Sequence, residues 1–185
     1  MSTAVINPHC WTRVEYERMI AAGVFHPEAR LELIDGTIVT VTPQGSVHAT
    51  AIGLMEQALR LALGAGYYIR IQMPLALSDA SEPEPDVAVV AGTPRDYRFA
   101  HPSTAVLVVE VAEATLNFDR EQKKKLYARS AIPEYWVINL VDNQLEVYRG
   151  PQTDDFAWKT TLRRGDSVSP LAFSDSSVRV DDLLP

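Results

Sequence analysis

Two acidic residues stand in stretches of sequence that otherwise have the composition of buried β-strands. Asp86 opens the segment 86–91 directly after a proline, and Glu110 interrupts the valine-rich segment 105–112. Short, continuously apolar runs are typical of strands covered on both faces. Carboxylates are almost never fully buried without a partner. Each of these acids therefore needs a cation, a proton or solvent beside it.

The two acids come together if the two strands are antiparallel neighbours. Pairing Ala91 with Ala105 across the connecting loop places Asp86 opposite Glu110, whereas a slip of one residue would put their side chains on opposite faces. Directly opposed residues have Cβ atoms about 4.5–5.5 Å apart, and like charges there are destabilising. A hard divalent cation with oxygen ligands resolves this repulsion, and so does protonation of one carboxyl group. Taken singly, Asp86 also fits a solvated strand end and Glu110 an ion pair with arginine; together they favour a site.

A strongly charged segment follows, and its pattern predicts a short helix over 119–130. Asp119, Lys123 and Tyr127 are spaced four residues apart and therefore share a face of this helix. We expect Lys123 to point inward, toward the end of the strand that carries Glu110. A solvated face with an ion pair between Asp119 and Lys123 would have the same spacing. The segment has five basic side chains and is the only local basic patch that the sequence indicates.

A central sheet has to position these residues. Thr12 and Glu15 have the spacing of a capping box, which predicts a helix that ends near Gly23. Other patterns indicate a hairpin over 30–41 and a long helix over 46–64. Further strands are expected at 67–72, 74–77, 134–140, 144–149 and 156–162, with a loop at 78–85. The sequence therefore predicts an α/β (α+β) fold, with a mixed central β-sheet between the long helix and the short charged helix.

Length and composition limit the class of protein. The 185 residues predict a single domain over 1–185, with a core at about 12–149 and C-terminal strands over 150–185. The net charge of −7 excludes a polybasic nucleic-acid binder but allows an enzyme with a local basic patch. The single cysteine, Cys10, cannot form an internal disulfide. No stretch approaches the roughly 20 apolar residues that cross a bilayer, so we expect a soluble, cytoplasmic protein.

Several short motifs, taken in order, resemble a known family. Pro85-Asp86, Glu110-Val111 and the pattern Asp119-Arg120-x-x-Lys123-x-x-x-Tyr127 resemble the Uma-two family of restriction-endonuclease-like proteins, in the PD-(D/E)XK nuclease superfamily. Ile132-Pro133-Glu134-Tyr135-Trp136, the hairpin at 31–36 and His48 also fit the family's pattern. One departure is Ala112, because superfamily members usually carry a lysine there. In this family that lysine corresponds to Lys123.

The resemblance implies a restriction-endonuclease-like core with a sheet of four to five strands. It implies an endonuclease that hydrolyses phosphodiester bonds, with DNA as the expected substrate and Mg²⁺ or Mn²⁺ as the cofactor. The metal ligands it implies are Asp86, Glu110, the Val111 carbonyl and, completing or orienting the shell, Glu32. Lys123 would assist catalysis, and His48, Asp119 and Tyr127 are further candidates for the site. Analogy with the superfamily also suggests a homodimer.

Two other classes of function stay open. A catalytically degenerate member of the family, acting as an interaction or regulatory module, would fit the charge of −7 and the absence of a lysine at position 112. A hydrolase that uses two carboxylates without a metal, such as a glycosidase, would fit the acid pair alone. The sequence shows no aromatic sugar platform beside these acids, which disfavours the glycosidase. Metal binding that depends on Asp86 separates the nuclease from the module.

Overall fold

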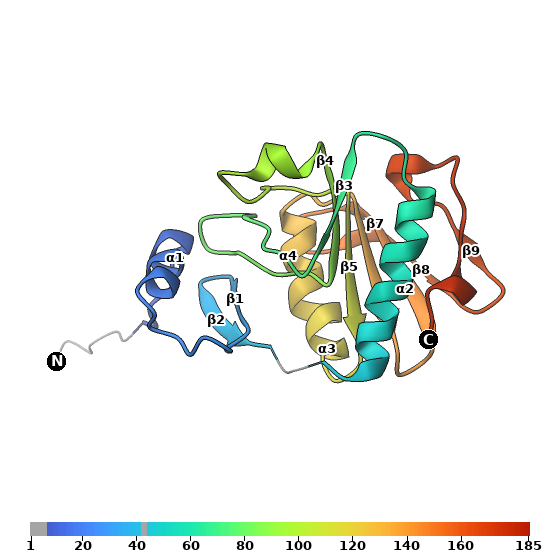
Figure 1. The fold of residues 1–185 in the computed structure, drawn as a ribbon. Coiled ribbons are helices and arrows are strands. Elements are labelled where there is room, and N and C mark those ends of the chain that lie inside the picture. Colours follow the sequence, from blue (N-terminus) through green and yellow to red (C-terminus); the bar gives the residue numbers. More distant parts are fainter. Residues whose placement is uncertain (1–6, 42–43) are drawn as a thin grey trace.

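The central sheet of the protein has six strands, in the order β3-β4-β5-β6-β7-β8 (Figure 1). The computed structural model describes residues 7–41 and 44–185. Strands β5 and β6 are parallel, and the other neighbouring pairs are antiparallel. The six strands are β3 (Tyr67–Ile71), β4 (Val87–Ala91), β5 (Leu107–Ala112), β6 (Glu134–Asn139), β7 (Gln144–Pro151) and β8 (Phe156–Leu162). The mixed sheet is as predicted, but it has more strands than the four to five that the resemblance implied.

Helices cover both faces of the sheet, as predicted (Figure 1). Helix α2 (Ser46–Ala62) packs its apolar stripe on one face, together with residues of the C-terminal segment. The other face is covered by α3 (Leu116–Phe118), a π-helical turn η2 (Asp119–Lys123) and α4 (Lys124–Arg129), which follow one another without a break. The predicted helix over 119–130 therefore begins earlier and contains a π-turn, a feature that is frequent at functional sites.

The register of β4 against β5 is the predicted one. Val87 pairs with Val109 and Ala88 with Val108, so Asp86 and Glu110 are the next residues that face each other. Because side chains alternate along a strand, the even-numbered residues of both strands point toward α4 and the odd-numbered residues toward α2. Both acids therefore lie on the face that α4 covers.

The N-terminal part forms a separate hairpin of β1 (Leu31–Ile34) and β2 (Thr37–Thr40), rather than adding to the central sheet. Its turn residues Asp35 and Gly36 have φ of 49° and 75°, as a tight hairpin turn requires. An isolated bridge from Leu33 to Glu82 attaches the hairpin to the loop before β4. Helix α1 (Arg13–Ala21) begins with the predicted capping box. The hairpin thus forms a wall beside the start of β4.

The segment 74–77, predicted as a strand, is irregular. Gln72 has φ of 50° and turns the chain out of β3. The amides of Leu75 and Ala76 then donate to the carbonyls of Pro83 and Pro102, which belong to loops. The predicted loop 78–85 is confirmed, with single bridges only.

The remaining elements are short. They are the turns η1 (Pro94–Tyr97), η3 (Leu171–Phe173) and η4 (Val180–Asp182), and the strand pair β9 (Ser167–Val168) and β10 (Val178–Arg179). Within the described ranges, no helix is long and apolar enough to cross a membrane.

Candidate active site

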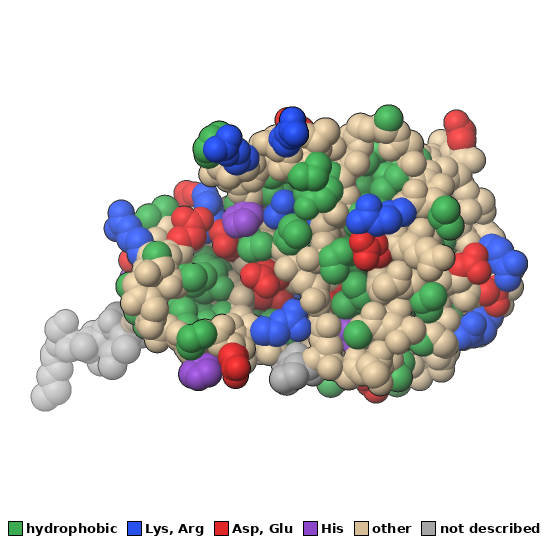
Figure 2. All heavy atoms as spheres, viewed as in Figure 1, with side chains coloured by type: hydrophobic (Ala, Val, Ile, Leu, Met, Phe, Trp, Pro, Cys, Tyr) green, Lys and Arg blue, Asp and Glu red, His purple; other side chains and the backbone are tan. Residues whose placement is uncertain are grey.

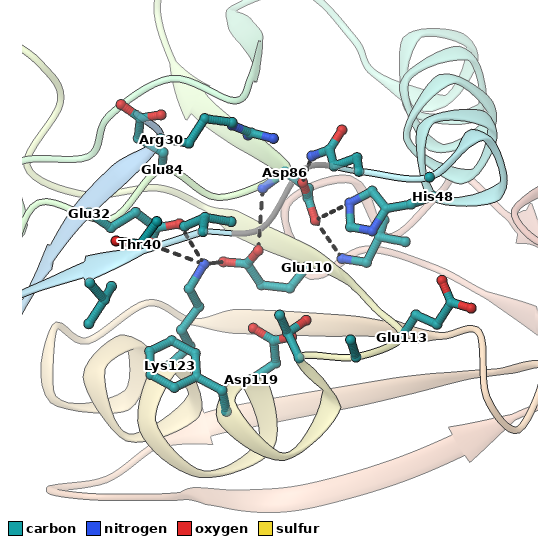
Figure 3. Close-up of a pocket in the computed structure, with 18 residues that line it drawn as sticks. Arg30, Glu32, Thr40, His48, Glu84, Asp86, Glu110, Glu113, Asp119 and Lys123 are labelled. Atoms are coloured by element: carbon teal, nitrogen blue, oxygen red, sulfur yellow. Dashed lines mark hydrogen bonds and ion pairs between the residues drawn. The ribbon is translucent and has the colours of Figure 1, made fainter. Parts of the chain in front are cut away.

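A cavity of about 230 Å³ lies where β4 begins and β5 ends (Figure 3). The β1–β2 hairpin, the first turn of α2 and the π-turn form its walls. The predicted site residues that line it are Glu32, His48, Asp86, Glu110, Val111, Asp119 and Lys123. Tyr127 is fully buried and contacts Glu110. The fold therefore brings together all the residues singled out in the sequence, including two that are separated by 91 positions.

Asp86 is held by donors on both carboxylate oxygens. Oδ2 accepts a hydrogen bond of 2.8 Å from the Val111 amide and lies 3.2 Å from His48 Nε2. Oδ1 accepts from the side-chain amides of Gln44 and Gln72, at 3.2 and 3.1 Å. Burial acts to raise the pKa of Asp86, but the hydrogen bond and charge of His48 and the Val111 amide outweigh it, so the pKa is lowered. Asp86 is therefore a buried carboxylate that stays ionised.

Glu110 has the opposite electrostatic environment. It is 3% exposed, and burial raises its pKa well above the ordinary value; Lys123 opposes this rise, while the charge of Asp86 adds to it. Oε1 accepts a hydrogen bond of 2.6 Å from the Tyr127 hydroxyl and one of 3.0 Å from Lys123 Nζ. Oε2 faces the backbone amide of Asp86 at 3.4 Å. Two facing carboxyl groups thus differ in how readily each one holds a proton.

Lys123 points into the cavity, toward Glu32 and Glu110 (Figure 3). Its Nζ lies 3.0 Å from Glu110 Oε1 and 3.1 Å from Glu32 Oε2. Burial acts to lower the pKa of Lys123, but Glu110, Glu32 and Asp119 raise it above its ordinary value. The side chain is therefore a fixed ammonium group and does not serve as a general base.

The π-turn brings Asp119 to the same cavity. Burial raises the pKa of Asp119 to about 6, against the lowering effect of Lys123. Its Oδ2 is buried and has no hydrogen-bond partner among the described residues. The backbone carbonyl of Asp119 accepts from the Tyr135 hydroxyl at 3.2 Å, which fixes the turn to the sheet. Tyr135 is itself fully buried.

The basic helical segment is not the free basic patch that its sequence suggested. Lys123 is bound inside the cavity, and Arg120 pairs with buried Glu146 on β7. The other three basic residues also lie within ion-pair distance of carboxylates: Lys124 with Asp155, Lys125 with Glu121, and Arg129 with Asp35 and Asp154. Four of these basic residues join the helical segment to other parts of the fold, and the fifth, Lys125, pairs with an exposed acid of the same segment.

The chemistry of the cavity fits a hard divalent cation. Asp86 and Glu110 provide carboxylate oxygens, and the buried Oδ2 of Asp119 has no hydrogen-bond partner among the described residues. Glu32 adds a third carboxylate, which pairs with Lys123. Among residues 7–41 and 44–185, no three His, Cys, Asp or Glu side chains are already arranged as a ligand set. Mg²⁺ does not require such a set, because it is usually bound by one or two carboxylates and keeps several water molecules.

Other residues that define this cavity were not predicted from the sequence. Gln44 and Gln72 hold Asp86, and Arg30 and Glu84 stand at the wall formed by the hairpin (Figure 3). A single glutamine gives no periodic signal, so neither amide could be found from spacing. The left-handed backbone of Gln72 is the one local mark of its special position.

The fold and the cavity together define a restriction-endonuclease-like protein. The chain belongs to the Uma2 family, described as "Putative restriction endonuclease", whose model matches residues 13–181. This confirms the resemblance found in the sequence. The fold is similar to the crystal structure of "a putative nuclease belonging to DUF820" from Anabaena variabilis, with a TM-score of 0.67 and 16% identity over 93% of this chain and 96% of that chain. No curated protein matches the sequence.

Proposed function

We propose that this protein is a Mg²⁺-dependent endonuclease that hydrolyses phosphodiester bonds of DNA. The observation that carries the proposal is the convergence of Asp86, Glu110 and Lys123 on one cavity at the end of two adjacent strands. Membership of a family described as restriction endonucleases supports it. Mn²⁺ is the second metal that the carboxylate ligands would accept.

The metal ligands of the proposal are Asp86, Glu110 and the Val111 carbonyl, with Glu32 completing or orienting the shell. When bound there, Mg²⁺ supplies a Lewis acid that polarises the phosphodiester and lowers the pKa of a water molecule. Asp86 is already ionised and is fixed by the Val111 amide. Tyr127 fixes Glu110 by donating to Oε1, so this carboxyl group cannot rotate freely.

Lys123 supplies the second element of catalysis. Its ammonium group is buried, protonated and held by Glu110 and Glu32. A preorganised positive charge in a site that excludes water stabilises the negative charge that develops on the phosphate oxygens in the transition state. An ammonium group has three N–H donors, so one that donates to neither Glu110 nor Glu32 can orient the attacking water. His48, at the first turn of α2, would contact the phosphate beside Asp86.

A plasmid-nicking assay tests this function. We expect the wild type to nick supercoiled plasmid with Mg²⁺ or Mn²⁺ and to stop when a chelator is added. Asp86→Asn should abolish nicking, whereas Asp175→Asn, which changes an exposed acid far from the cavity along the chain, should not. A wild type that leaves the plasmid intact with both metals would refute the proposal. A homodimer that cuts both strands is part of the proposal, and light scattering of the purified protein tests it.

A non-catalytic interaction module is the second candidate. The ion pair that already occupies Glu110 and Glu32, and the charge of −7, favour it. Calorimetry separates the two functions, because only the enzyme needs affinity for Mg²⁺ or Mn²⁺ that is lost in Asp86→Ala. Heats that are the same in wild type and variant would favour the module.

A further inference from the structure

We propose that the loop between β4 and β5, residues 92–102, binds a single-stranded segment of the nucleic acid on which the enzyme acts, with a base stacked on Phe99 and phosphates contacted by Arg95 and Arg98. This inference rests on the proposed function, since it names a contact of the substrate away from the cavity. The loop follows β4, and Asp86 directly precedes β4, so the two places lie at opposite ends of one strand.

The loop carries two arginines whose charges have no carboxylate partner among the described residues. Arg95 and Arg98 are exposed, and neither has an ion pair with a carboxylate of the described residues. The acid between them, Asp96, accepts instead from the amide and hydroxyl of Thr93, at 2.7 and 2.9 Å. This contrasts with the basic residues of η2 and α4, which are all paired. In an acidic protein, the loop is therefore a surface suited to a polyanion.

A buried cation beneath the loop adds to this charge. Arg70 on β3 is 5% exposed, and its Nε has no hydrogen-bond partner among the described residues. Its Nη2 donates to the Pro74 carbonyl at 3.1 Å and lies 3.3 Å from His101 Nδ1. The guanidinium is 5.8 and 5.7 Å from the ring centres of Tyr68 and Tyr97. Buried charges are normally paired with an opposite charge, and here a bound phosphate would supply it.

The aromatic ring of the proposed binding surface is exposed on the same loop. Phe99 is 89% exposed, and the Arg98 guanidinium lies 4.8 Å from its ring centre. An open ring with an adjacent cation is the arrangement on which bases of single-stranded nucleic acid stack. Figure 2 shows Lys or Arg side chains beside a hydrophobic one at the upper edge of the molecule, where Figure 1 draws the segment after β4. A base in a duplex keeps its faces covered by its neighbours, so the ring favours unpaired bases.

Local contacts fix the conformation of the loop that carries Arg95, Arg98 and Phe99. Gly92 has φ of 87°, and a Cβ there would lie 2.7 Å from Asp96 Oδ2. Thr93 and Asp96 form a capping box around η1, and the Tyr97 hydroxyl donates to the Ala91 carbonyl at 2.6 Å. A preorganised surface loses little entropy when it binds. Five residues of β4 span about 17 Å at roughly 3.4 Å per residue, so a strand that reaches both the loop and the cavity must cover this distance.

Fluorescence anisotropy with a labelled single-stranded oligonucleotide, in the presence of a chelator so that nothing is cut, tests the proposal. We expect Phe99→Leu to weaken binding about tenfold and Phe99→Tyr, which keeps the ring, to bind like wild type. Arg98→Ala should weaken binding and reduce the slope of log affinity against log salt concentration by about one. With a duplex of the same length and closed hairpin ends, the effect of Phe99→Leu should disappear.

Arg163→Ala is the matched control, because Arg163 is also exposed and its loss changes the net charge equally. Binding that is equal in wild type, Phe99→Leu and Arg98→Ala would overturn the proposal, and so would an equal weakening by Arg163→Ala. A failure of the proposed nuclease function gives a different result from a failure of this binding proposal. A wild type that binds the oligonucleotide through the loop but never cuts would refute the nuclease and leave the loop's role standing. All three positions are exposed, so thermal melting should be unchanged in every variant.

Discussion

The ammonium group of Lys123 lies 3.0 Å from Oε1 of Glu110, and both side chains are more than nine-tenths buried. The two residues come from different layers of the fold, since Glu110 belongs to the central sheet and Lys123 to the helical segment that covers it. Neither charge has enough water around it to stand alone. The catalytic arrangement of the proposal is therefore also an element of the protein's stability.

Removing the cation should destabilise the protein in the absence of metal. In Lys123→Met the carboxylates of Glu110 and Glu32 lose their counterion, and breaking a buried pair typically costs about 3–5 kcal/mol. Urea denaturation should show this loss, and Mg²⁺ should restore part of it, because a cation that binds only the folded state stabilises it. Lys123→Arg, which keeps the charge, should lose less of the free energy of unfolding than Lys123→Met. An unchanged free energy of unfolding in Lys123→Met without metal would contradict the account.

The hydroxyl of Tyr127 is expected to position Glu110. Tyr127→Phe removes the donor to Oε1 and should cost about 1–2 kcal/mol of stability. We also expect kcat to fall about tenfold with KM nearly unchanged, since the hydrogen bond orients a catalytic group rather than the substrate. Tyr148→Phe is the matched control, because Tyr148 donates a similar bond to buried Glu146, outside the cavity. Equal losses of kcat in the two variants would show that the effect is structural.

Because of Glu82, the protein should become less stable as the pH rises. This residue is 5% exposed, and burial followed by the charge of Glu17 raises its pKa to about 7, against the lowering effect of Arg13. The ordinary pKa is 4.5, so between the two values the folded state binds more protons than the unfolded state. The free energy of unfolding contributed by Glu82 therefore decreases as pH rises through this window.

Glu82→Gln should remove this penalty. Near pH 8 the variant should be more stable than wild type by on the order of 2 kcal/mol, and near pH 4 the difference should vanish. Urea denaturation at the two pH values measures it, with the exposed Glu28→Gln as a control. A difference that stays the same at both pH values would mean that Glu82 does not titrate as described.

The register of β4 and β5 was assumed from the length of their connection, because strands that are apolar on both faces do not specify it by pattern alone. The assumed pairing, which places Asp86 opposite Glu110, agrees with the observed one. The inward direction of Lys123 could be predicted, because the helical face it shares with Tyr127 must cover the sheet.

Other features depend on contacts that no local pattern encodes. Residues 74–77 have strand-like composition, but the left-handed Gln72 directs them into a loop whose amides bind distant carbonyls. The partners that neutralise the basic helical segment come from β7 and from loops far along the chain. Because charge pairing is a tertiary property, the sequence pointed to that segment as basic, although its basic residues are paired, whereas Arg95 and Arg98 have no carboxylate partner among the described residues.

The most direct test of the central claim is the initial rate of plasmid nicking with Mg²⁺ by wild type, Asp86→Asn, Glu110→Gln and Lys123→Arg, beside the control Asp175→Asn. We expect metal-dependent nicking by wild type and the control. The Asp86 and Glu110 variants should nick at least about 100-fold more slowly, as expected when groups that stabilise the charge of the transition state are lost. Lys123→Arg should retain part of the rate. Equal rates for wild type, Asp86→Asn and Glu110→Gln would contradict the assignment of this cavity as the active site.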